Sequence, residues 1–334
     1  MIRIALACSF LTALVAQEPE TIVESTQPEA IEMGAGSHRF AWVAGWGTTA
    51  DGKDIGNTHG CVVVDAAGHV YANTDTEDAV RIYDRDGHLL RTWGKDWKGG
   101  LHGMTLVREG EKEFLYLAHT ARHEVAKATL AGEVLWTLGA PAEAGVYDDA
   151  AKFKPTSVAV ADNGDIYVAD GYGQSWIHQF DKDRAYVRSF GGRGKEPGKL
   201  QTPHGIWIDR RVEPHVLVVC DRENHRLQLF DLDGKHLRVL DTEVRRPCNV
   251  CAYGDDVAVA DLCGRVSLFD KEWKVITHLG DNPDQKQWAN NGVPRAKWRD
   301  GVFIAPHGAA FDADGNLYVL DWVAAGRISK LARR

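Results

Sequence analysis

The chain has 334 residues, 44% hydrophobic residues and a formal net charge of −8 at pH 7. This length allows a full hydrophobic core, and the negative charge, without a stripe of Lys and Arg, argues against a nucleic acid or an anionic membrane surface as partner. The 34 glycines and 11 tryptophans favour an all-β protein with many short strands and tight turns. We expect a monomer that acts on a small molecule or a peptide.

Residues 1–16 are typical of a secretory signal peptide, because Arg3 is followed by an apolar run that ends at the small residue Ala16. This run is too short to span a bilayer, and no later stretch approaches about 18 apolar residues. A lipoprotein anchor at Cys8 is less attractive, since Cys8 lies so close to the start. We expect an exported protein, periplasmic or extracellular, without membrane insertion, and a disordered acidic leader at residues 17–37.

Five of the six cysteines lie after the expected signal peptide, so they cannot all pair with one another. An oxidising compartment permits a disulfide among Cys248, Cys251 and Cys263. A domain of this size does not need one, and we expect the cysteines to be mostly core residues.

A pattern of four short strands repeats about every 45 residues. Its clearest copy covers residues 153–192 and has β-rich runs at residues 157–160, 165–169, 176–180 and 186–190, separated by turn residues. The five other copies begin near His59, His102, His204, Cys248 and His307. Six copies of a four-stranded unit indicate a six-bladed β-propeller of the NHL-repeat type over residues 38–334.

The two ends of the repeat region complement each other. The last copy stops at Arg334 without its outermost strand, and residues 40–47 carry the pattern of that strand ahead of the first copy. A closed ring explains both features, because the early strand would complete the last blade and remove exposed sheet edges. The alternative is an open stack of sheets or two β-sandwiches. The polar insertion at residues 282–300 is expected to lie over one face of the ring, as a candidate wall of a substrate cleft.

One position recurs at the start of the innermost strand of each blade, where a side chain would point toward the channel. Its occupants are His59, His102, Thr156, His204, Cys248 and His307. The histidines of blades two, four and six would converge on the axis by three-fold symmetry. Three imidazoles with an open fourth position are typical of a catalytic zinc site, which polarises a carbonyl or acidifies a bound hydroxyl.

The alternative is a purely structural role, in which these His-Gly pairs close turns and each imidazole forms a hydrogen bond to a neighbouring strand. His59 lies in blade one and breaks the three-fold pattern. We therefore expect it to contact substrate or to support a metal ligand.

A second recurring position is the loop after the second strand of each blade, which begins with an aspartate in blades three to six. These aspartates are expected to be repeat scaffolding that accepts backbone N–H bonds. Tyr172 and Arg222 occur in these loops without being repeated. The Tyr172 hydroxyl could act as a general base beside a metal, and Arg222 could hold a substrate carboxylate. Ordinary loop surface is the alternative for both.

The segments VADGYGQSWIHQF, GKLQTPHGIWID and CDRENHRLQLFD resemble the peptidyl-α-hydroxyglycine α-amidating lyases, most strongly over residues 153–231. Other NHL propellers share the blade pattern without this combination. The resemblance implies cleavage of a carbinolamide C–N bond, which releases a primary amide and glyoxylate. It also implies roles for the site residues: zinc ligands at His102, His204 and His307, the catalytic tyrosine at Tyr172 and an active-site arginine at Arg222.

The chain departs from that family at several positions. The loop of blade one offers Asn73 and no cation where the family has a second arginine, and we assign Asn73, like His59, to substrate contact or ligand support. Gly308 stands where the family has an acidic calcium ligand, so calcium on the axis is allowed but disfavoured. Gly173 and Leu229 stand at expected positions of the family's disulfides.

Two other functions stay open. The chain could be a non-catalytic NHL module that binds a peptide or protein partner at the channel mouth. It could also be a propeller hydrolase of the lactonase kind, although such enzymes usually rely on carboxylate-rich calcium centres. A column rich in imidazoles suits zinc better.

Overall fold

The computed structural model describes residues 30–49 and 52–334. The expected signal peptide and most of the expected leader, up to residue 29, lie outside the described residues. The described residues contain no helical segment with the length and apolar character needed to span a bilayer.

Twenty-five strands are described, grouped into six sheets. Blade one contains β3 (Val62–Val64), β4 (Val70–Asn73), β5 (Val80–Tyr83) and β6 (Leu89–Trp93). Blade two contains β7 (Leu101–Glu109), β8 (Lys112–His119), β9 (Glu124–Thr129) and β10 (Val134–Leu138). Blade three contains β11 (Ser157–Val160), β12 (Ile166–Ala169), β13 (Trp176–Phe180) and β14 (Tyr186–Gly191).

Blade four contains β15 (Pro203–Asp209), β16 (Val216–Asp221), β17 (Arg226–Asp231) and β18 (His236–Leu240). Blade five contains β19 (Pro247–Tyr253), β20 (Asp256–Asp261), β21 (Arg265–Phe269) and β22 (Val275–Leu279). Blade six contains β23 (Pro306–Phe311), β24 (Leu317–Asp321), β25 (Arg327–Arg333), β2 (His38–Val43) and β1 (Glu32–Ala35). Short 3-10 helices occur at η1 (Lys95–Trp97), η2 (Ala142–Ala144), η3 (Ala150–Lys152), η4 (Arg222–Asn224), η5 (Gln285–Gln287) and η6 (Arg295–Lys297).

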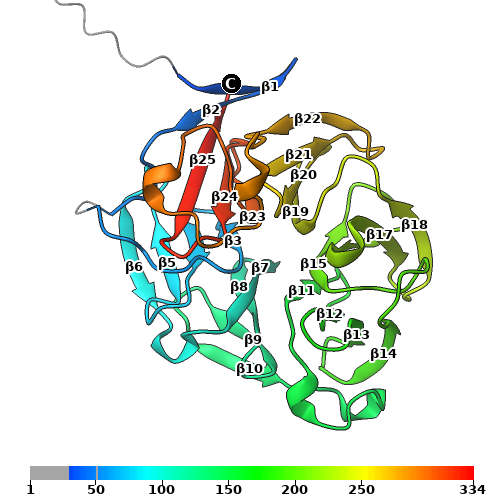
Figure 1. The fold of residues 1–334 in the computed structure, drawn as a ribbon. Helices are drawn as coiled ribbons and strands as arrows, with labels where there is room; N and C mark the ends of the chain where they lie inside the picture. The colour runs from blue at the N-terminus through cyan, green and yellow to red at the C-terminus, as the bar shows by residue number, and fades with distance from the viewer. Residues whose placement is uncertain (1–29, 50–51) are drawn as a thin grey trace, which may run out of the picture. The chain divides into compact units, whose positions relative to one another are not determined.

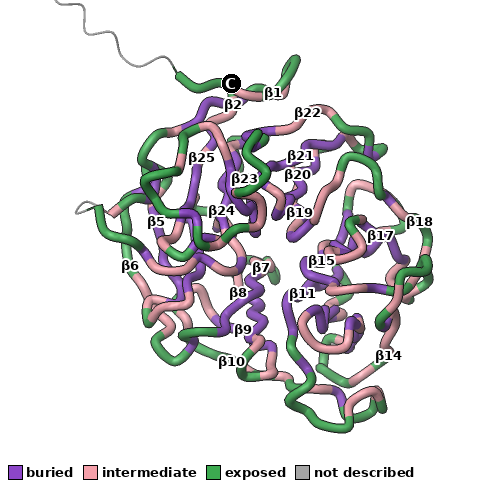
Figure 2. The backbone as a smooth tube through the Cα atoms, viewed as in Figure 1, coloured by how far each residue is buried: buried purple, intermediate pink, exposed green. Residues whose placement is uncertain are grey.

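The six sheets form a closed ring, which confirms the predicted six-bladed β-propeller. The first strand of each blade lies innermost, and each inner strand contacts the inner strand of the next blade, from β3 through β7, β11, β15 and β19 to β23 and back to β3 (Figure 1). The inner and middle strands are largely buried, whereas the outer strands are more exposed (Figure 2). This arrangement directs the starts of all six inner strands toward one axis.

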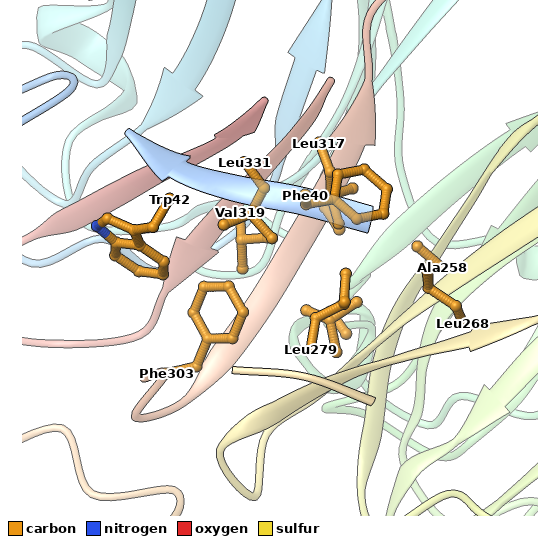
Figure 3. Packing of buried hydrophobic residues seen from close by; sticks show 12 residues of the cluster. Phe40, Trp42, Ala258, Leu268, Leu279, Phe303, Leu317, Val319 and Leu331 are labelled. Carbon is orange, nitrogen blue, oxygen red and sulfur yellow. The ribbon is translucent and has the colours of Figure 1, made fainter. Parts of the chain in front are cut away.

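The early strand closes the ring as predicted. Strand β2 pairs antiparallel with β25, with Phe40 opposite Arg333 and Val43 opposite Lys330. Phe40 is fully buried, and the Trp42 ring lies 5.4 Å from the Phe303 ring (Figure 3). The last blade is therefore built from both ends of the described chain and shares its core with blade five.

Strand β1 adds a fifth strand to blade six within the stretch that was expected to be disordered. A tight turn at Gly36, whose φ is +56°, reverses the chain so that Ala35 lies opposite His38. Met33 packs against the core of blades five and six, and Glu32 accepts a hydrogen bond from Arg39 at 2.8 Å. The ordered part of the chain thus begins earlier than residue 38, because one apolar side chain and one hairpin turn suffice to extend an exposed sheet edge.

The loop aspartates act as scaffolding, in agreement with the prediction from their repetition. Each of these aspartates is fully buried. Its carboxylate accepts hydrogen bonds from backbone N–H groups in the segment that leads into the innermost strand of its own blade. The pairs are Asp170 with Lys154, Asp221 with Gln201, Asp261 with Arg245 and Arg246, and Asp321 with Ile304 and Ala305. These bonds fix the backbone just before the position that faces the channel.

The five described cysteines are free thiols. Cys220 and Cys248 are buried, and Cys61, Cys251 and Cys263 are partly buried. Hydrophobic burial and strand pairing therefore hold the described fold without a disulfide among these residues.

The closing strand gives a first test. Replacing the fully buried Phe40 by Ala should lower the free energy of unfolding by about 3–5 kcal/mol, because it removes a large side chain from the core that joins blades five and six. Denaturant unfolding followed by tryptophan fluorescence measures this loss. Leu90→Ala on the outer strand β6 is the matched control, since Leu90 is 51% exposed and should change stability by less than about 0.5 kcal/mol. Equal effects of the two changes would contradict the role of β2 in closure.

Candidate functional site

The three histidines predicted as metal ligands occupy the same place in three blades. Each is the second residue of an inner strand: His102 in β7, His204 in β15 and His307 in β23. Strand pairing shifts register at each of them, between Leu101 and Gly103 and at the equivalent places in blades four and six. A register shift of this kind is a β-bulge, which can turn a side chain out of the regular alternation. The bulge explains how these side chains leave the sheet and face the channel.

A backbone carbonyl of the next blade fixes each imidazole. Nδ1 of His102 lies 2.8 Å from the carbonyl oxygen of Thr156, Nδ1 of His204 lies 3.0 Å from that of Cys248, and Nδ1 of His307 lies 2.9 Å from that of Gly60. Because a carbonyl only accepts, Nδ1 must carry the proton in each ring. The neutral tautomer therefore leaves the lone pair on Nε2, as a metal ligand requires.

The glycine after each histidine allows this contact. A Cβ atom on Gly103, Gly205 or Gly308 would collide with the backbone of the neighbouring blade, including the same three carbonyl oxygens. The His-Gly pair is thus one device: glycine lets the next blade approach, and histidine donates to the carbonyl that arrives. The alternative, in which each imidazole bonds a neighbouring strand, also fits the contacts of Nδ1, but it gives Nε2 of His307 no partner.

The three imidazoles lie together in a buried cluster. Their ring centres are 4.7 Å apart for His102 and His204, 5.0 Å for His102 and His307, and 4.4 Å for His204 and His307. Each side chain is at most 2% exposed. Burial, reinforced by neighbouring positive groups, lowers the pKa of all three well below its usual value, so the rings are neutral near pH 7. Neutral imidazole is the form that binds metal.

Three groups of potential metal ligands occur among the described residues, and none of them contains all three predicted ligands. One is formed by Asp84, Asp86 and His88 on a turn of blade one, and the two others share His307. One of these two combines His307 with His59 and His102, and the other combines it with His204 and Cys248, each with ligand atoms within 4.8 Å of one another. Nε2 of His307 is buried and has no hydrogen-bond partner among the described residues. An orphaned imidazole nitrogen surrounded by three more imidazoles and a thiol fits a soft or borderline cation such as zinc.

His59 is held differently from the other histidines. Its Nδ1 lies 3.8 Å from the Asp75 carboxylate instead of forming a hydrogen bond with a carbonyl. The centre of its ring lies 4.9 Å from that of His102 and 5.1 Å from that of His307. Burial lowers the pKa of His59, while Asp75 opposes this shift. His59 therefore lies against the cluster, with a looser support than the other three histidines have.

Tyr172 lies at the centre of the cluster, in the loop between β12 and β13. Its hydroxyl is 3.1 Å from Nε2 of His102 and 3.2 Å from Nε2 of His204. Arg222, at the start of η4, donates from Nη1 to the same hydroxyl at 3.3 Å. Burial raises the pKa of Tyr172, and the positive charge of Arg222 works against that rise. Arg222 and two of the three predicted ligands, His102 and His204, thus contact the hydroxyl oxygen of Tyr172.

Asn73 lies near the cluster, but its side-chain amide forms hydrogen bonds with backbone groups. Its side chain is fully buried, accepts from the Cys61 N–H at 2.7 Å and donates to the carbonyls of His59 and Leu101 at 3.0 and 2.5 Å. It therefore fixes the start of blade one and supports the site through the backbone of His59.

A pocket of about 190 Å³ opens beside these residues. His59, Tyr172 and His307 form its inner wall, Arg222 and Arg246 add two guanidinium groups, and Leu262, Ala289 and Trp322 add apolar surface. Ala289 belongs to the insertion at residues 282–300, which therefore contributes to the pocket as predicted. The lining is mainly polar, and polar groups that converge on a hollow of this kind can orient a small ligand.

Sequence reasoning missed Arg246 and Glu223. Glu223 Oε1 accepts from Nε of Arg222 at 2.9 Å and from Nη2 of Arg246 at 2.7 Å, which links blades four and five at the pocket edge. Neither residue is repeated, and no local pattern marks the pair. Cys248 was placed in the channel column, but its grouping with two imidazoles could not be read from the sequence.

Comparisons with known proteins agree with the propeller fold. Residues 154–180 match the NHL repeat. A gluconolactonase from Xanthomonas campestris superposes with a TM-score of 0.61 at 13% identity, over 90% of this chain and 91% of the other. Such a likeness concerns the fold alone. The chain is a six-bladed β-propeller, and one of its blades matches the NHL repeat.

Its sequence relatives include lyases. Human NHL repeat-containing protein 3 is 28% identical over 185 residues, which is 52% of each chain. A probable peptidyl-alpha-hydroxyglycine alpha-amidating lyase from Caenorhabditis elegans is 33% identical over 155 residues, which is 45% of this chain and 42% of the relative. The matches thus span about half of these relatives or less. Within its class, the chain resembles the peptidyl-α-hydroxyglycine α-amidating lyases.

The His-Gly device gives a second test. Gly205→Ala should push away the carbonyl of Cys248 that holds His204, and loss of such an outer support costs about 10- to 100-fold in metal affinity. Competition with a chromogenic zinc chelator measures the affinity. Gly139→Ala is the matched control, because a Cβ there meets only an ordinary contact. Unchanged affinity in Gly205→Ala would show that the carbonyl does not orient a ligand.

Proposed function

We propose that the protein is a zinc-dependent lyase that cleaves the C–N bond of α-hydroxyglycine-type amides to give an amide and glyoxylate. The observation that carries this proposal is the meeting of three buried imidazoles with the Tyr172 hydroxyl and the Arg222 guanidinium at the inner wall of a pocket. The named relatives support the same reaction class. We further propose that the protein is exported and acts as a monomer.

His102, His204 and His307 would hold the zinc ion through Nε2, since Nδ1 of each is already bonded to a carbonyl. A bound zinc ion would act as a Lewis acid that favours the negative oxygen developing from the substrate hydroxyl. Calcium at the channel is a weaker proposal, because the donors grouped around His307 are imidazole and thiol rather than carboxylate. Burial of the cluster would exclude competing water from the reacting bond.

The reaction needs a proton acceptor and then a proton donor. The hydroxyl proton of the substrate leaves, the carbon–oxygen bond becomes the carbonyl of glyoxylate, and the electron pair of the breaking C–N bond moves to the amide nitrogen. That nitrogen takes up one proton, so the step is balanced. Tyr172 is suited to accept the first proton and return it, because its hydroxyl faces the cluster and Arg222 supports its negative form.

Metal content tests the proposal directly. The purified protein should contain about one zinc ion per chain, and the variant with alanine at His102, His204 and His307 should contain close to none, because three of the four positions of a catalytic site are lost. Elemental analysis by mass spectrometry measures both. His69→Ala is the control, since this side chain is 41% exposed on a turn of blade one and belongs to no group of potential metal ligands among the described residues. Zinc retained by the triple variant would contradict the assigned ligands.

The reaction itself is tested with an N-acyl-α-hydroxyglycine. The wild-type protein should release glyoxylate, and Tyr172→Phe should lower kcat by about 10²- to 10⁴-fold, because it removes the proton-transfer group and keeps the ring. Tyr186→Phe is the control, since its hydroxyl bonds Ser189 in the same blade. Full turnover by Tyr172→Phe would contradict the assignment. A wild-type protein that binds zinc but releases no glyoxylate would point to a non-catalytic binding module.

A further inference from the structure

The pocket beside the cluster has an unbalanced charge. Its walls carry the guanidinium groups of Arg222 and Arg246, and no carboxylate lines it. Glu223 pairs with both arginines, so two positive charges share one negative charge. A pocket with excess positive charge on partly buried guanidinium groups favours an anionic ligand, and a planar carboxylate matches guanidinium geometry best.

The two arginines are not equally free to bind such a ligand. Arg222 donates from Nε to Glu223 at 2.9 Å and from Nη1 to the Tyr172 hydroxyl at 3.3 Å. Its side chain is only 11% exposed, and its guanidinium lies 5.4 Å from the centre of the Tyr172 ring. These contacts hold the Arg222 guanidinium against Tyr172 and leave it little room to bind a ligand.

The Arg246 guanidinium is held in place on one side and can bind a ligand on the other. Its Nε and Nη2 donate to Glu223 at 3.2 and 2.7 Å, while Nη1 makes no hydrogen bond within the described part of the chain. The side chain is 29% exposed and lines the pocket. The carboxylate of Glu223 therefore holds one edge of the guanidinium and leaves the other edge for a ligand, which reduces the entropy lost on binding.

We propose that Arg246 binds the carboxylate of the substrate and that Arg222 instead supports Tyr172. The inference rests on the proposed function and assigns the residue that recognises the substrate carboxylate, which the product glyoxylate retains. The amide side of such a substrate would extend along Leu262, Ala289 and Trp322, the uncharged walls of the pocket. The Arg222 assignment expected from the sequence is thereby divided between two residues.

Kinetics separate these roles. Arg246→Ala should raise KM for an N-acyl-α-hydroxyglycine by about 10- to 100-fold, because a charge-assisted contact to the carboxylate is lost, while kcat changes by less than about three-fold. The KM for the methyl ester of the same compound should not change. Arg246→Lys should recover part of the loss for the acid, since it keeps the charge without the planar fork. A fall in kcat at constant KM would instead make Arg246 a positioning residue for Arg222 and overturn the proposal.

Arg245 provides the matched control. It precedes Arg246 in the chain, but it pairs with Asp281 at 2.7 Å and its guanidinium lies 4.1 Å from the centre of the Trp288 ring, outside the lining of the pocket. Arg245→Ala should leave KM for both the acid and the ester unchanged. An equal rise of KM in both variants would assign the effect to general loss of positive charge and overturn the proposal.

A binding measurement separates this inference from the reaction. Calorimetric titration of the zinc-loaded protein with glyoxylate should show binding that weakens by about 10- to 100-fold in Arg246→Ala and stays unchanged in Arg245→Ala. Equal affinity in the wild type and Arg246→Ala overturns the inference, even where the wild type releases glyoxylate. Failure to release glyoxylate overturns the proposed function, whereas binding that depends on Arg246 still supports its role as a carboxylate ligand.

Discussion

A hydrogen bond from each imidazole to the backbone of the next blade underlies the site. The bond leaves one nitrogen of His102, His204 and His307 facing the channel and engages the other. It is possible only because a glycine follows each histidine and a β-bulge turns the side chain inward. The orientation of each imidazole is therefore set by a main-chain carbonyl at the start of an inner strand, and sites built on strands are more precise than sites built on loops.

The repeat made the fold predictable from the sequence. Four runs of alternating residues per copy specify a blade, six copies specify a ring, and residues 40–47 supply the strand that the last copy lacks. Strand β1 was not predictable, because its pairing depends on an edge that exists only after β2 has joined blade six. The order of blades also placed three histidines around one axis, and Figure 1 shows the inner strands converging there.

Chemical detail at the site was less predictable. The tautomer of each histidine depends on carbonyl groups far away in the chain, and the pairing of Glu223 with Arg246 joins two blades. Neither contact leaves a trace in the local sequence. Tyr172 and Arg222 stood out because they interrupt a repeat, but their mutual bond and its effect on the tyrosine pKa arise only in three dimensions. Sequence pattern thus located the chemistry, while long-range packing determines how each group behaves.

Closure by an early strand also affects when the site can form. Phe40 and Leu331 belong to one core, although nearly the whole chain separates them, so the ring can close only after the last blade has been synthesised. His307 lies in that blade and donates to a carbonyl of the first. Until the ends meet, the nascent polypeptide holds scattered imidazoles with no common centre. Under the proposed function, zinc would be bound in full only by the closed ring, and its binding would favour that ring over open intermediates by mass action.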